Sequence, residues 1–327
     1  MKIALIGPGI MAIPPPGWGA VEILIWDYYK ELVNQGHSVD IINKIRSNDF
    51  EQRDPESQYC RDLISTINSK DYDFVHLHYD VLYHILSSLK CPRVAITSHY
   101  PNLGLFHKHK EDQYTEIFEG ICNNTNHYIF APSKKDLLIF ESKCKDPTKI
   151  VLVINSSDHR DITPNFNGKF TDRSIYLGRI EERKQQHKYY SIPGIDFYGR
   201  CIYPQFSQLP CYKGEPSRAE LLDLLSNYGN LVHLSACENA TPLVIKEALL
   251  AGLPIVTNKW SMDDLDPDLP FIDVIPDEKL DDLGYIYSII RQNCSKQHLK
   301  NTIRDYAYQK FSTEVLVKEY IEKIDKI

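Results

Sequence analysis

The amino-acid sequence predicts an α/β fold made of two domains, each built on a parallel sheet. First, a chain of 327 residues is longer than one hydrophobic core usually organises. Second, short β-branched apolar runs alternate with longer amphipathic stretches, which is the pattern of parallel strands joined by helices. Third, 43% hydrophobic and 25% charged residues are typical of a globular chain, so disorder is excluded as the general state.

In the first half of the chain, the apolar runs predict strands and the amphipathic stretches between them predict helices. The strands are expected at Lys2–Ile6, Ser38–Ile42, Phe74–Leu77, Arg93–Thr97, Tyr128–Phe130 and Lys149–Ile154. The helices are expected at Ala20–Gln35, Gln58–Asn68, Val81–Ser88, Gln113–Asn123 and Lys134–Glu141. Gly36 directly follows the first helix and is a typical helix stop.

A polar, turn-rich segment over 156–172 predicts the domain boundary, through Asp158, Asp161, Pro164, Asn165, Asn167 and Gly168. We therefore expect an N-terminal domain at 1–160 and a second domain at 161–312. The second domain repeats the alternation, with strands at Ser174–Leu177, Gly194–Tyr198, Leu231–Leu234 and Pro254–Thr257. Its helices are expected at Ser217–Asn227 and Leu243–Ala251, and the chain is helical and amphipathic from about Lys279 to Ile327.

Charge and cysteine usage limit the partners and the compartment. A net charge of -7 gives no broad attraction for nucleic acid or anionic lipid, so we expect no nucleic-acid partner. The eight cysteines are scattered without metal-ligand spacing, which indicates free thiols and a cytoplasmic protein. No apolar run reaches the roughly 18 residues of a membrane span, so any membrane contact is expected to be peripheral.

The first loop allows three interpretations. Gly7–Ala12 matches G-x-G-x-x-A after a strand, the fingerprint of an NAD(P)-dependent oxidoreductase. Pro14–Pro16 and the glycines that follow forbid a helix that starts inside that turn, so this is the less favoured alternative. In the favoured interpretation Gly17 and Gly19 bring free amides close to phosphate or sugar oxygens, and the helix begins near Ala20. A purely structural loop is the third.

Several segments, in order along nearly the whole chain, resemble a known family. Pro15–Glu22 resembles the first-loop signature of the family 4 retaining glycosyltransferases, which have the GT-B fold. Further similar segments are Val75–His78, Thr97–His99, Ala131–Ser133 and Asn155–Asp158, the last without the family's glycine. The resemblance implies two Rossmann-like domains facing a central cleft, the first binding the acceptor and the second the sugar nucleotide. It also implies a final helix, 313–327, that returns to the N-terminal domain.

Tyr176–Arg179, followed by Lys184, is similar to the family's strand, its Gly-Arg pair and its lysine. A guanidinium and an ammonium at a strand end can together neutralise a diphosphate. The resemblance therefore implies that Arg179 and Lys184 hold the donor diphosphate, with solvated surface charge as the alternative. Because this pair makes a metal unnecessary, we expect no metal and no cofactor. Asp71–Asp73 and Asp264–Asp266 match D-x-D, but such tripeptides arise freely in acidic loops.

The segment Glu238–Val256 resembles the family's paired-glutamate motif, in which a loop carboxylate is followed by a helix start and a second carboxylate. Free amides at a helix start can hold phosphate, and here the segment consists of Thr241, Pro242, Leu243 and Val244. Glu247, one turn inside the helix, can accept both ribose hydroxyls. Glu238 and Glu247 enclose eight residues, one more than in the family. Either Glu238 or Asn239 therefore takes the position that contacts the donor sugar.

His99 ends an apolar strand, where the carboxyl edge of a parallel sheet faces the ligand. The family's histidine at this position lies near the transferred sugar, and a neutral imidazole there can donate to a hydroxyl. His76 and His78 on a neighbouring strand are rival candidates.

The expected function is that of a retaining glycosyltransferase. It moves a sugar from a nucleoside-diphosphate sugar to a glycan, lipid or small-molecule acceptor. The alternative is a catalytically silent protein that binds a sugar nucleotide or a glycan, motivated by the displaced Glu238 and the missing turn glycine.

Overall fold

The computed structural model describes residues 1–162 and 168–327, and it divides into two compact units. The first unit comprises Met1–Pro15, Gly19–Asn155 and Leu316–Ile327, and the second comprises Pro16–Trp18 and Ser156–Val315. The segment that predicted the domain boundary also includes Pro164, Asn165 and Asn167, which lie outside the described residues. Each unit is described in turn.

The first unit is built on a six-stranded parallel sheet in the order β2-β1-β3-β4-β5-β6. Its strands are β1 (Lys2–Ile6), β2 (Ser38–Ile42), β3 (Phe74–Leu77), β4 (Val94–Ile96), β5 (Tyr128–Ala131) and β6 (Ile150–Leu152). The first three coincide with the predicted ranges. β4 and β6 are shorter than predicted because the flanking residues lie beyond the regular hydrogen-bonded ladder, whereas β5 extends one residue further than predicted, to Ala131.

The helices of the first unit follow the predicted order, with two differences. They are α1 (Ala20–Asn34), α2 (Gln58–Asn68), α3 (Phe106–Glu111), α4 (Thr115–Asn123) and α5 (Lys134–Lys143), with 3-10 helices η1 (Asp80–Ser88) and η2 (Pro147–Lys149). The α-helix expected at Val81–Ser88 is wrong in type, because apolar spacing in a short segment does not separate an α-helix from a 3-10 helix. The sequence did not predict α3, which is mostly polar.

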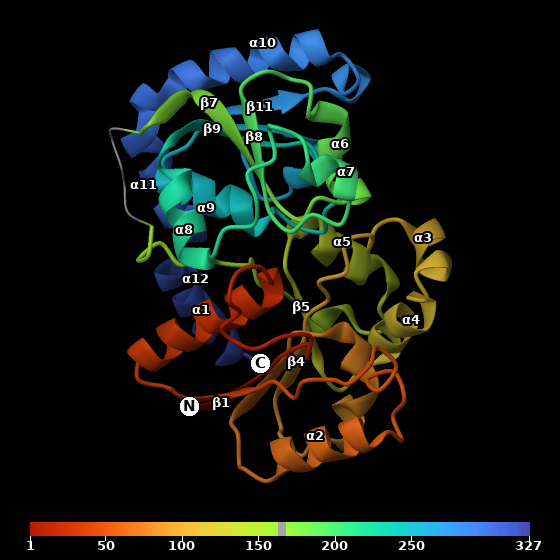
Figure 1. Ribbon diagram of the computed structural model, residues 1–327. Helices are drawn as coiled ribbons and strands as arrows, with labels where there is room; N and C mark the ends of the chain where they lie inside the picture. The colour runs from red at the N-terminus through yellow and green to blue at the C-terminus, as the bar shows by residue number, and fades with distance from the viewer. Residues whose placement is uncertain (163–167) are drawn as a thin grey trace. The chain divides into compact units, whose positions relative to one another are not determined.

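Alternating residues of β1 supply both faces of this sheet, as the two-residue period of a strand requires. Ile3 and Leu5 pack in one cluster with residues of α1 and of the C-terminal helix, whereas Ala4 and Ile6 pack in another with residues of α2. Figure 1 shows the same arrangement, with α1 and the blue C-terminal helix on one side of β1 and α2 on the other.

The second unit has a five-stranded parallel sheet in the order β11-β10-β9-β7-β8. Its strands are β7 (Phe170–Leu177), β8 (Ile195–Tyr198), β9 (Tyr228–His233), β10 (Ile255–Asn258) and β11 (Ile272–Ile275). The four predicted strands are present with shifted ends. The sequence did not predict β11, a four-residue strand interrupted by Asp273.

The helices of the second unit cover this sheet. They are α6 (Gln186–Tyr189), α7 (Pro204–Ser207), α8 (Arg218–Leu225), α9 (Leu243–Ala251), α10 (Leu283–Cys294) and α11 (Lys300–Phe311). Short 3-10 helices are η3 (Glu182–Lys184), η4 (Lys259–Ser261), η5 (Asp277–Lys279) and η6 (Ser295–Leu299). Ile286 and Ile290 of α10 pack in one cluster with Val232 of β9 and Val256 of β10.

The last helix, α12 (Thr313–Ile324), carries the chain back to the first unit. Val317, Tyr320 and Ile324 are fully buried and recur at helical spacing, so one stripe of α12 completes the core above β1 and β3. The Tyr320 hydroxyl lies 3.0 Å from His76 Nδ1 of β3. The predicted return of the final helix is confirmed.

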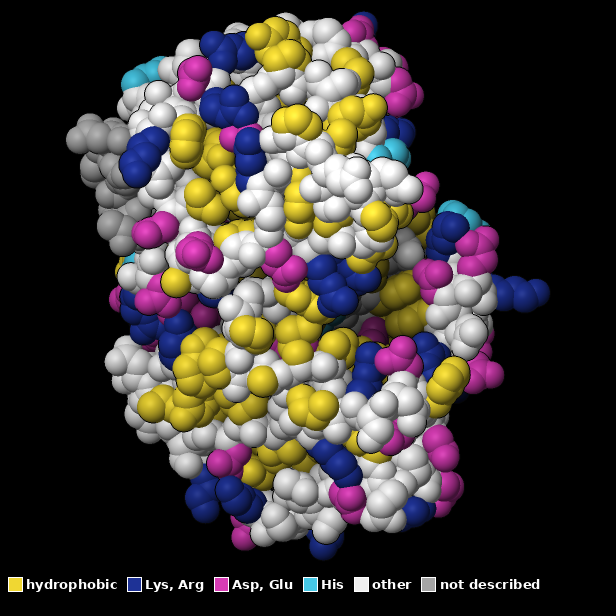
Figure 2. Space-filling view, in the orientation of Figure 1, with side chains coloured by type: hydrophobic (Ala, Val, Ile, Leu, Met, Phe, Trp, Pro, Cys, Tyr) yellow, Lys and Arg dark blue, Asp and Glu magenta, His cyan; other side chains and the backbone are white. Residues whose placement is uncertain are grey.

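On the face shown in Figure 2, Lys and Arg side chains are interspersed with Asp and Glu side chains. Within 1–162 and 168–327, the structure has no helix of the length and apolar character that a membrane span needs.

Candidate functional site

In the second unit, two loops meet at the carboxyl ends of neighbouring strands. β7 and β9 pair in parallel, so the residues after Leu177 and after His233 emerge at the same edge of the sheet. The loops are tied together because Ala236 N donates to Arg183 O at 2.8 Å and Arg183 Nη1 donates to Cys237 O at 3.1 Å. Ligands of α/β sheets bind at such carboxyl edges, so this junction is the candidate donor site.

Glu238 is the centre of this junction. Its Oε1 accepts from Lys184 Nζ at 2.5 Å and lies 3.2 Å from His233 Nε2, and its Oε2 accepts from Arg183 Nη1 at 2.9 Å. The glutamate is only 7% exposed. The Glu238 side chain therefore lies against Lys184, while the side chain of Asn239 beside it is half-buried.

The charge states of this cluster follow from burial and from its ion pairs. Burial alone raises the pKa of Glu238, but Lys184, His233 and Arg183 together hold that pKa well below its usual value. Burial lowers the pKa of Lys184, and Glu238 opposes the effect. Burial and the nearby Lys184 lower the pKa of His233 to about 4. At neutral pH we therefore assign a carboxylate, an ammonium and a neutral imidazole that donates its Nε2 hydrogen to Glu238.

Arg179, the other predicted diphosphate ligand, has different surroundings. Its side chain is 45% exposed, and its Nε lies 3.5 Å from Glu181. Arg183, together with Lys184, instead forms an ion pair with Glu238. It also pairs with Glu181 at 3.0 Å. Sequence reasoning missed Arg183 and His233. Arg183 could have been predicted because it directly precedes Lys184. His233 could have been predicted because it ends a strand.

The start of α9 has the geometry that phosphate binding needs. Ile245 N and Lys246 N donate to Pro242 O at 3.0 and 3.3 Å, so Leu243 and Val244 present their N–H groups ahead of the first intrahelical bonds. Pro242, at the N-cap, makes no side-chain cap hydrogen bond. The preceding Thr241 is anchored because its hydroxyl accepts from Asp264 N at 3.2 Å.

Glu247 lies inside α9 and is 1% exposed. Its Oε1 forms an ion pair with Arg218 Nη2 at 2.5 Å. Arg218 is the first residue of α8, whose start is fixed by a capping box between Ser217 and Glu220. Sequence reasoning missed Arg218, because no local pattern links it to a residue so much later in the chain.

The first loop has the predicted course. α1 begins at Ala20 with Gly19 as its N-cap at φ 122°, and a side-chain β-carbon there would meet Glu22 Oε2 at 2.9 Å. Only glycine fits that position without strain. Gly17 is roomier, with Pro216 O 3.7 Å from an added β-carbon.

The dinucleotide interpretation of this loop does not match its geometry. Gly7 N donates to Ile42 O at 3.0 Å and Gly9 N donates to Asn43 Oδ1 at 2.9 Å, so these amides already have protein acceptors. The helix starts only at Ala20. A pyrophosphate held at a helix start within the glycine turn is thus excluded.

Three histidines lie at the carboxyl edge of the first sheet. His76 contacts the Tyr320 hydroxyl and Thr97 Oγ1, at 3.0 and 2.8 Å, so it is tied into the protein. The rings of His78 and His99 stack 5.9 Å apart. Within the described residues, His99 Nε2 and both ring nitrogens of His78 are buried without a hydrogen-bond partner. Burial lowers the pKa of His99 to about 4 and that of His78 well below its usual value, so both are neutral at pH 7.

The D-x-D tripeptides are engaged within the protein. Asp73 Oδ2 accepts from Lys2 N at 2.7 Å. Asp264 is buried and raises the pKa of Lys246, although burial lowers that pKa overall to about 8. Among the residues that the structure describes, no group of three or more His, Cys, Asp or Glu is placed to hold a metal ion.

Comparison with known proteins gives the fold. No family model matches the chain, and no curated protein matches it either. Sucrose-phosphate synthase from Thermosynechococcus elongatus is similar with a TM-score of 0.76 and 16% identity, covering 99% of this chain and 98% of that one. HepE of Anabaena in complex with UDP-glucose has a TM-score of 0.74 at 14% identity, with 100% of both chains covered. WaaB, a lipopolysaccharide outer core galactosyltransferase, has a TM-score of 0.68 at 14% identity, covering 100% of this chain and 99% of that one.

These likenesses confirm the predicted fold class. The chain has the GT-B fold of two Rossmann-like domains, each with a parallel sheet, and the match extends over the full chain. Sequence identities this low establish the fold and not the function, because one fold supports many functions.

Proposed function

We propose that the chain is a retaining glycosyltransferase of family 4 that moves a sugar from a nucleoside-diphosphate sugar to an acceptor hydroxyl. The observation that carries the proposal is the buried contact of Lys184 and Arg183 with Glu238 at the carboxyl ends of β7 and β9. This cluster directly precedes the helix start at Pro242. The similar structure of HepE in complex with UDP-glucose supports the proposal through the shared fold.

In this proposal the second domain, 161–312, binds the donor. The donor diphosphate takes the cations that now contact Glu238, Lys184 and Arg183, with Arg179 at the exposed side, and the amides at the start of α9 bind its oxygens. Glu247 accepts the ribose hydroxyls, and Glu238 turns its freed oxygens to the donor sugar. Because charge develops on the diphosphate as the sugar leaves, these groups stabilise the transition state.

The first domain, 1–160 with the returning segment 313–327, binds the acceptor in this proposal. The neutral imidazole of His99 donates to a hydroxyl of the transferred sugar, because burial keeps it unprotonated at pH 7. The resemblance to a retaining family supports retention through a short-lived oxocarbenium-like ion pair. The cationic cluster supports transfer without a metal, and the free thiols of all eight cysteines support a cytoplasmic location.

The proposal is tested with a panel of UDP-, GDP- and ADP-sugars, scored by thermal shift and by release of nucleoside diphosphate. We expect one nucleotide to bind and to be released when an acceptor is present. Lys184→Ala removes one charge-assisted contact and is expected to weaken donor binding by about 100-fold. Lys188→Ala is the matched control, because Lys188 lies on α6 and pairs with Asp281 at 3.5 Å. Unchanged donor binding in folded Lys184→Ala contradicts the assignment.

A catalytically silent sugar-nucleotide-binding protein is the second candidate. It is favoured by one feature of that same cluster: Glu238 occupies both cations that a diphosphate would need, so a donor has to displace this carboxylate before it can bind. The same panel separates the two, because a silent protein shifts its melting temperature with a nucleotide sugar and releases no nucleoside diphosphate.

A further inference from the structure

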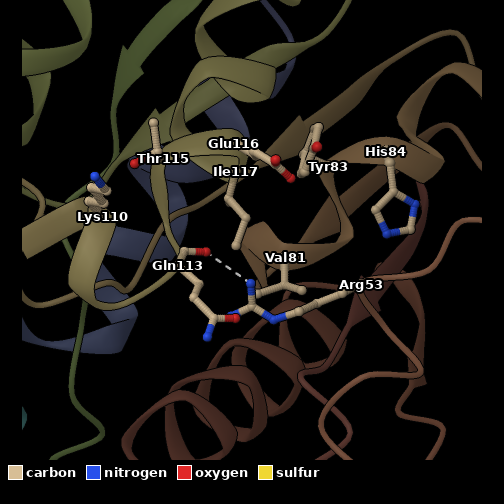
Figure 3. A pocket seen from close by; sticks show the side chains of 9 residues that line it. All are labelled: Arg53, Val81, Tyr83, His84, Lys110, Gln113, Thr115, Glu116 and Ile117. Carbon is tan, nitrogen blue, oxygen red and sulfur yellow. Dashed lines mark hydrogen bonds between the residues drawn. The ribbon is translucent and has the colours of Figure 1, made fainter.

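The first unit contains a cavity of about 410 Å³. Its walls come from the turn after β2, from η1 after β3, and from the corner between α3 and α4 after β4. Figure 3 shows these side chains around the opening. All three segments follow the carboxyl ends of parallel strands, the edge at which α/β sheets bind ligands.

The charged side chains of this cavity are mainly cationic. Arg53 and Lys110 lie on different walls, and Glu116 supplies one carboxylate (Figure 3). Arg53 Nη1 donates to Gln113 O at 2.9 Å, which ties the guanidinium to the opposite wall through one of its several N–H donors. Two cations against one carboxylate contrast with the net charge of -7 of the whole chain. The excess positive charge of the lining therefore attracts an anion to this cavity.

The rest of the lining suits a saccharide. Val81 and Ile117 form a buried apolar floor, and the half-buried ring of Tyr83 stands beside it. A β-carbon at Gly120 would lie 2.0 Å from the Tyr83 ring, so the glycine makes room for that ring position. Apolar and aromatic surface binds the C–H face of a sugar, while the amide of Gln113 and the hydroxyl of Thr115 supply polar contacts for its hydroxyls.

A buried hydrogen-bond network connects these walls to the strand end that carries His99. Asp80 Oδ2 accepts from Ser98 Oγ at 2.6 Å and from the Tyr114 hydroxyl at 2.5 Å. Asp80 directly precedes Val81, Ser98 directly precedes His99, and Tyr114 directly precedes Thr115. The network thus fixes two of the cavity walls, those that carry Val81 and Thr115, relative to the strand end that carries His99.

We propose that this cavity binds an acidic saccharide, a sugar bearing a carboxylate or a phosphate, with Arg53 and Lys110 contacting the acidic group. Its role as acceptor rests on the proposed function, whereas the binding itself does not. In the transfer, an acceptor hydroxyl oxygen forms the bond to the anomeric carbon as the bond from that carbon to the diphosphate oxygen breaks. The hydroxyl proton leaves with the diphosphate, so atoms and charge balance.

Binding is measured on the full chain by isothermal titration or ligand-observed NMR with methyl glucuronide, glucose 6-phosphate and methyl glucoside. We expect at least one acidic sugar to bind about tenfold or more tightly than the neutral glucoside, and the binding to weaken as salt rises. Arg53→Glu and Lys110→Glu are each expected to weaken it by a further tenfold or more. Lys90→Glu makes the same charge change at an exposed position outside the lining and is expected to have no effect.

Equal binding of acidic and neutral sugars, or binding that survives both charge reversals in folded protein, overturns the proposal. Absence of binding by all three probes also overturns it. Failure of the proposed function is a separate result: if no nucleotide sugar binds but acidic sugars still bind in an Arg53-dependent manner, the cavity assignment stands and the transferase assignment falls.

Discussion

At the carboxyl edge of the first sheet lie neutral imidazoles, whereas at the same edge of the second sheet lie paired charges. His78 and His99 are buried with ring nitrogens that have no partner among the described residues, while Glu238 contacts two cations. Both units have parallel sheets, so the fold supplies the edge and the side chains decide its charge. Buried ion pairs are costly to break and buried neutral imidazoles are sensitive to acid, so the two edges are expected to respond differently to mutation and pH.

The largest effect is expected from breaking the charge cluster. Glu238→Ala leaves Lys184 and Arg183 without their shared carboxylate and is expected to lower the free energy of unfolding of the second unit by about 3 kcal/mol. Urea unfolding measures this. In Glu238→Ala/Lys184→Met one stranded cation is removed, so part of the loss should return. A loss below about 0.5 kcal/mol in the single variant means that the cluster is solvated and that the comparison fails.

A smaller loss is expected at the second ion pair of the same unit. Arg218→Met leaves the carboxylate of Glu247 buried without this partly exposed cation, at an expected cost of about 2 kcal/mol. The cost should largely disappear in Arg218→Met/Glu247→Gln, since the amide carries no charge. If the single and double variants unfold at the same urea concentration, Arg218 does not compensate Glu247.

Lowering the pH tests the neutral imidazoles at the edge of the first sheet. The folded pKa of His99 is about 4, below the unfolded value of about 6.5. The unfolded state therefore binds more protons below pH 6.5, so this stability is complete above that pH and is lost as pH falls toward 4. The expected slope is about 1.4 kcal/mol per pH unit for one such histidine.

This slope is measured by urea unfolding between pH 7 and pH 5. Unfolding is monitored through the fluorescence of Trp26 in α1, in a protein in which Trp18 and Trp260 have been replaced by Phe. His99→Gln should reduce the slope. Glu238, whose pKa is well below its usual value, stays charged over this range. An identical slope in His99→Gln shows that other groups cause the acid sensitivity.

The smallest effect is expected in the first loop. Gly19→Ala forces a side chain into φ 122° and is expected to cost about 1 kcal/mol. Gly17→Ala is the control, because its added β-carbon has 3.7 Å of clearance to Pro216 O. Thermal unfolding of both variants measures the difference, and equal melting temperatures mean that the loop relaxes around Gly19.

Much of the fold was predictable because its strands are short apolar runs between turn residues. β1, β2 and β3 coincide with the predicted ranges, as do α2 and α9. The sequence failed where periodicity carries little information, at the 3-10 helix η1 and at β11, whose four residues include a charged one.

The sequence predicted the residues that match a family motif, but it did not predict the residues that contact them. Lys184, Glu238 and Glu247 were singled out because their spacing resembles a family motif. Arg183, His233 and Arg218 were not, because a contact between residues on different helices, strands and loops depends on the course of the chain between them and on the strand order. The functional roles of all these side chains remain predictions.

The placement of α12 in the first unit has a consequence for biosynthesis. Tyr320 of this helix packs among Tyr28, Phe74 and Phe130, which are translated far earlier. While the ribosome makes the second unit, the nascent first unit exposes the apolar groove that Val317, Tyr320 and Ile324 later fill. The part of the protein that is synthesised first therefore cannot complete its core until the last helix has been made.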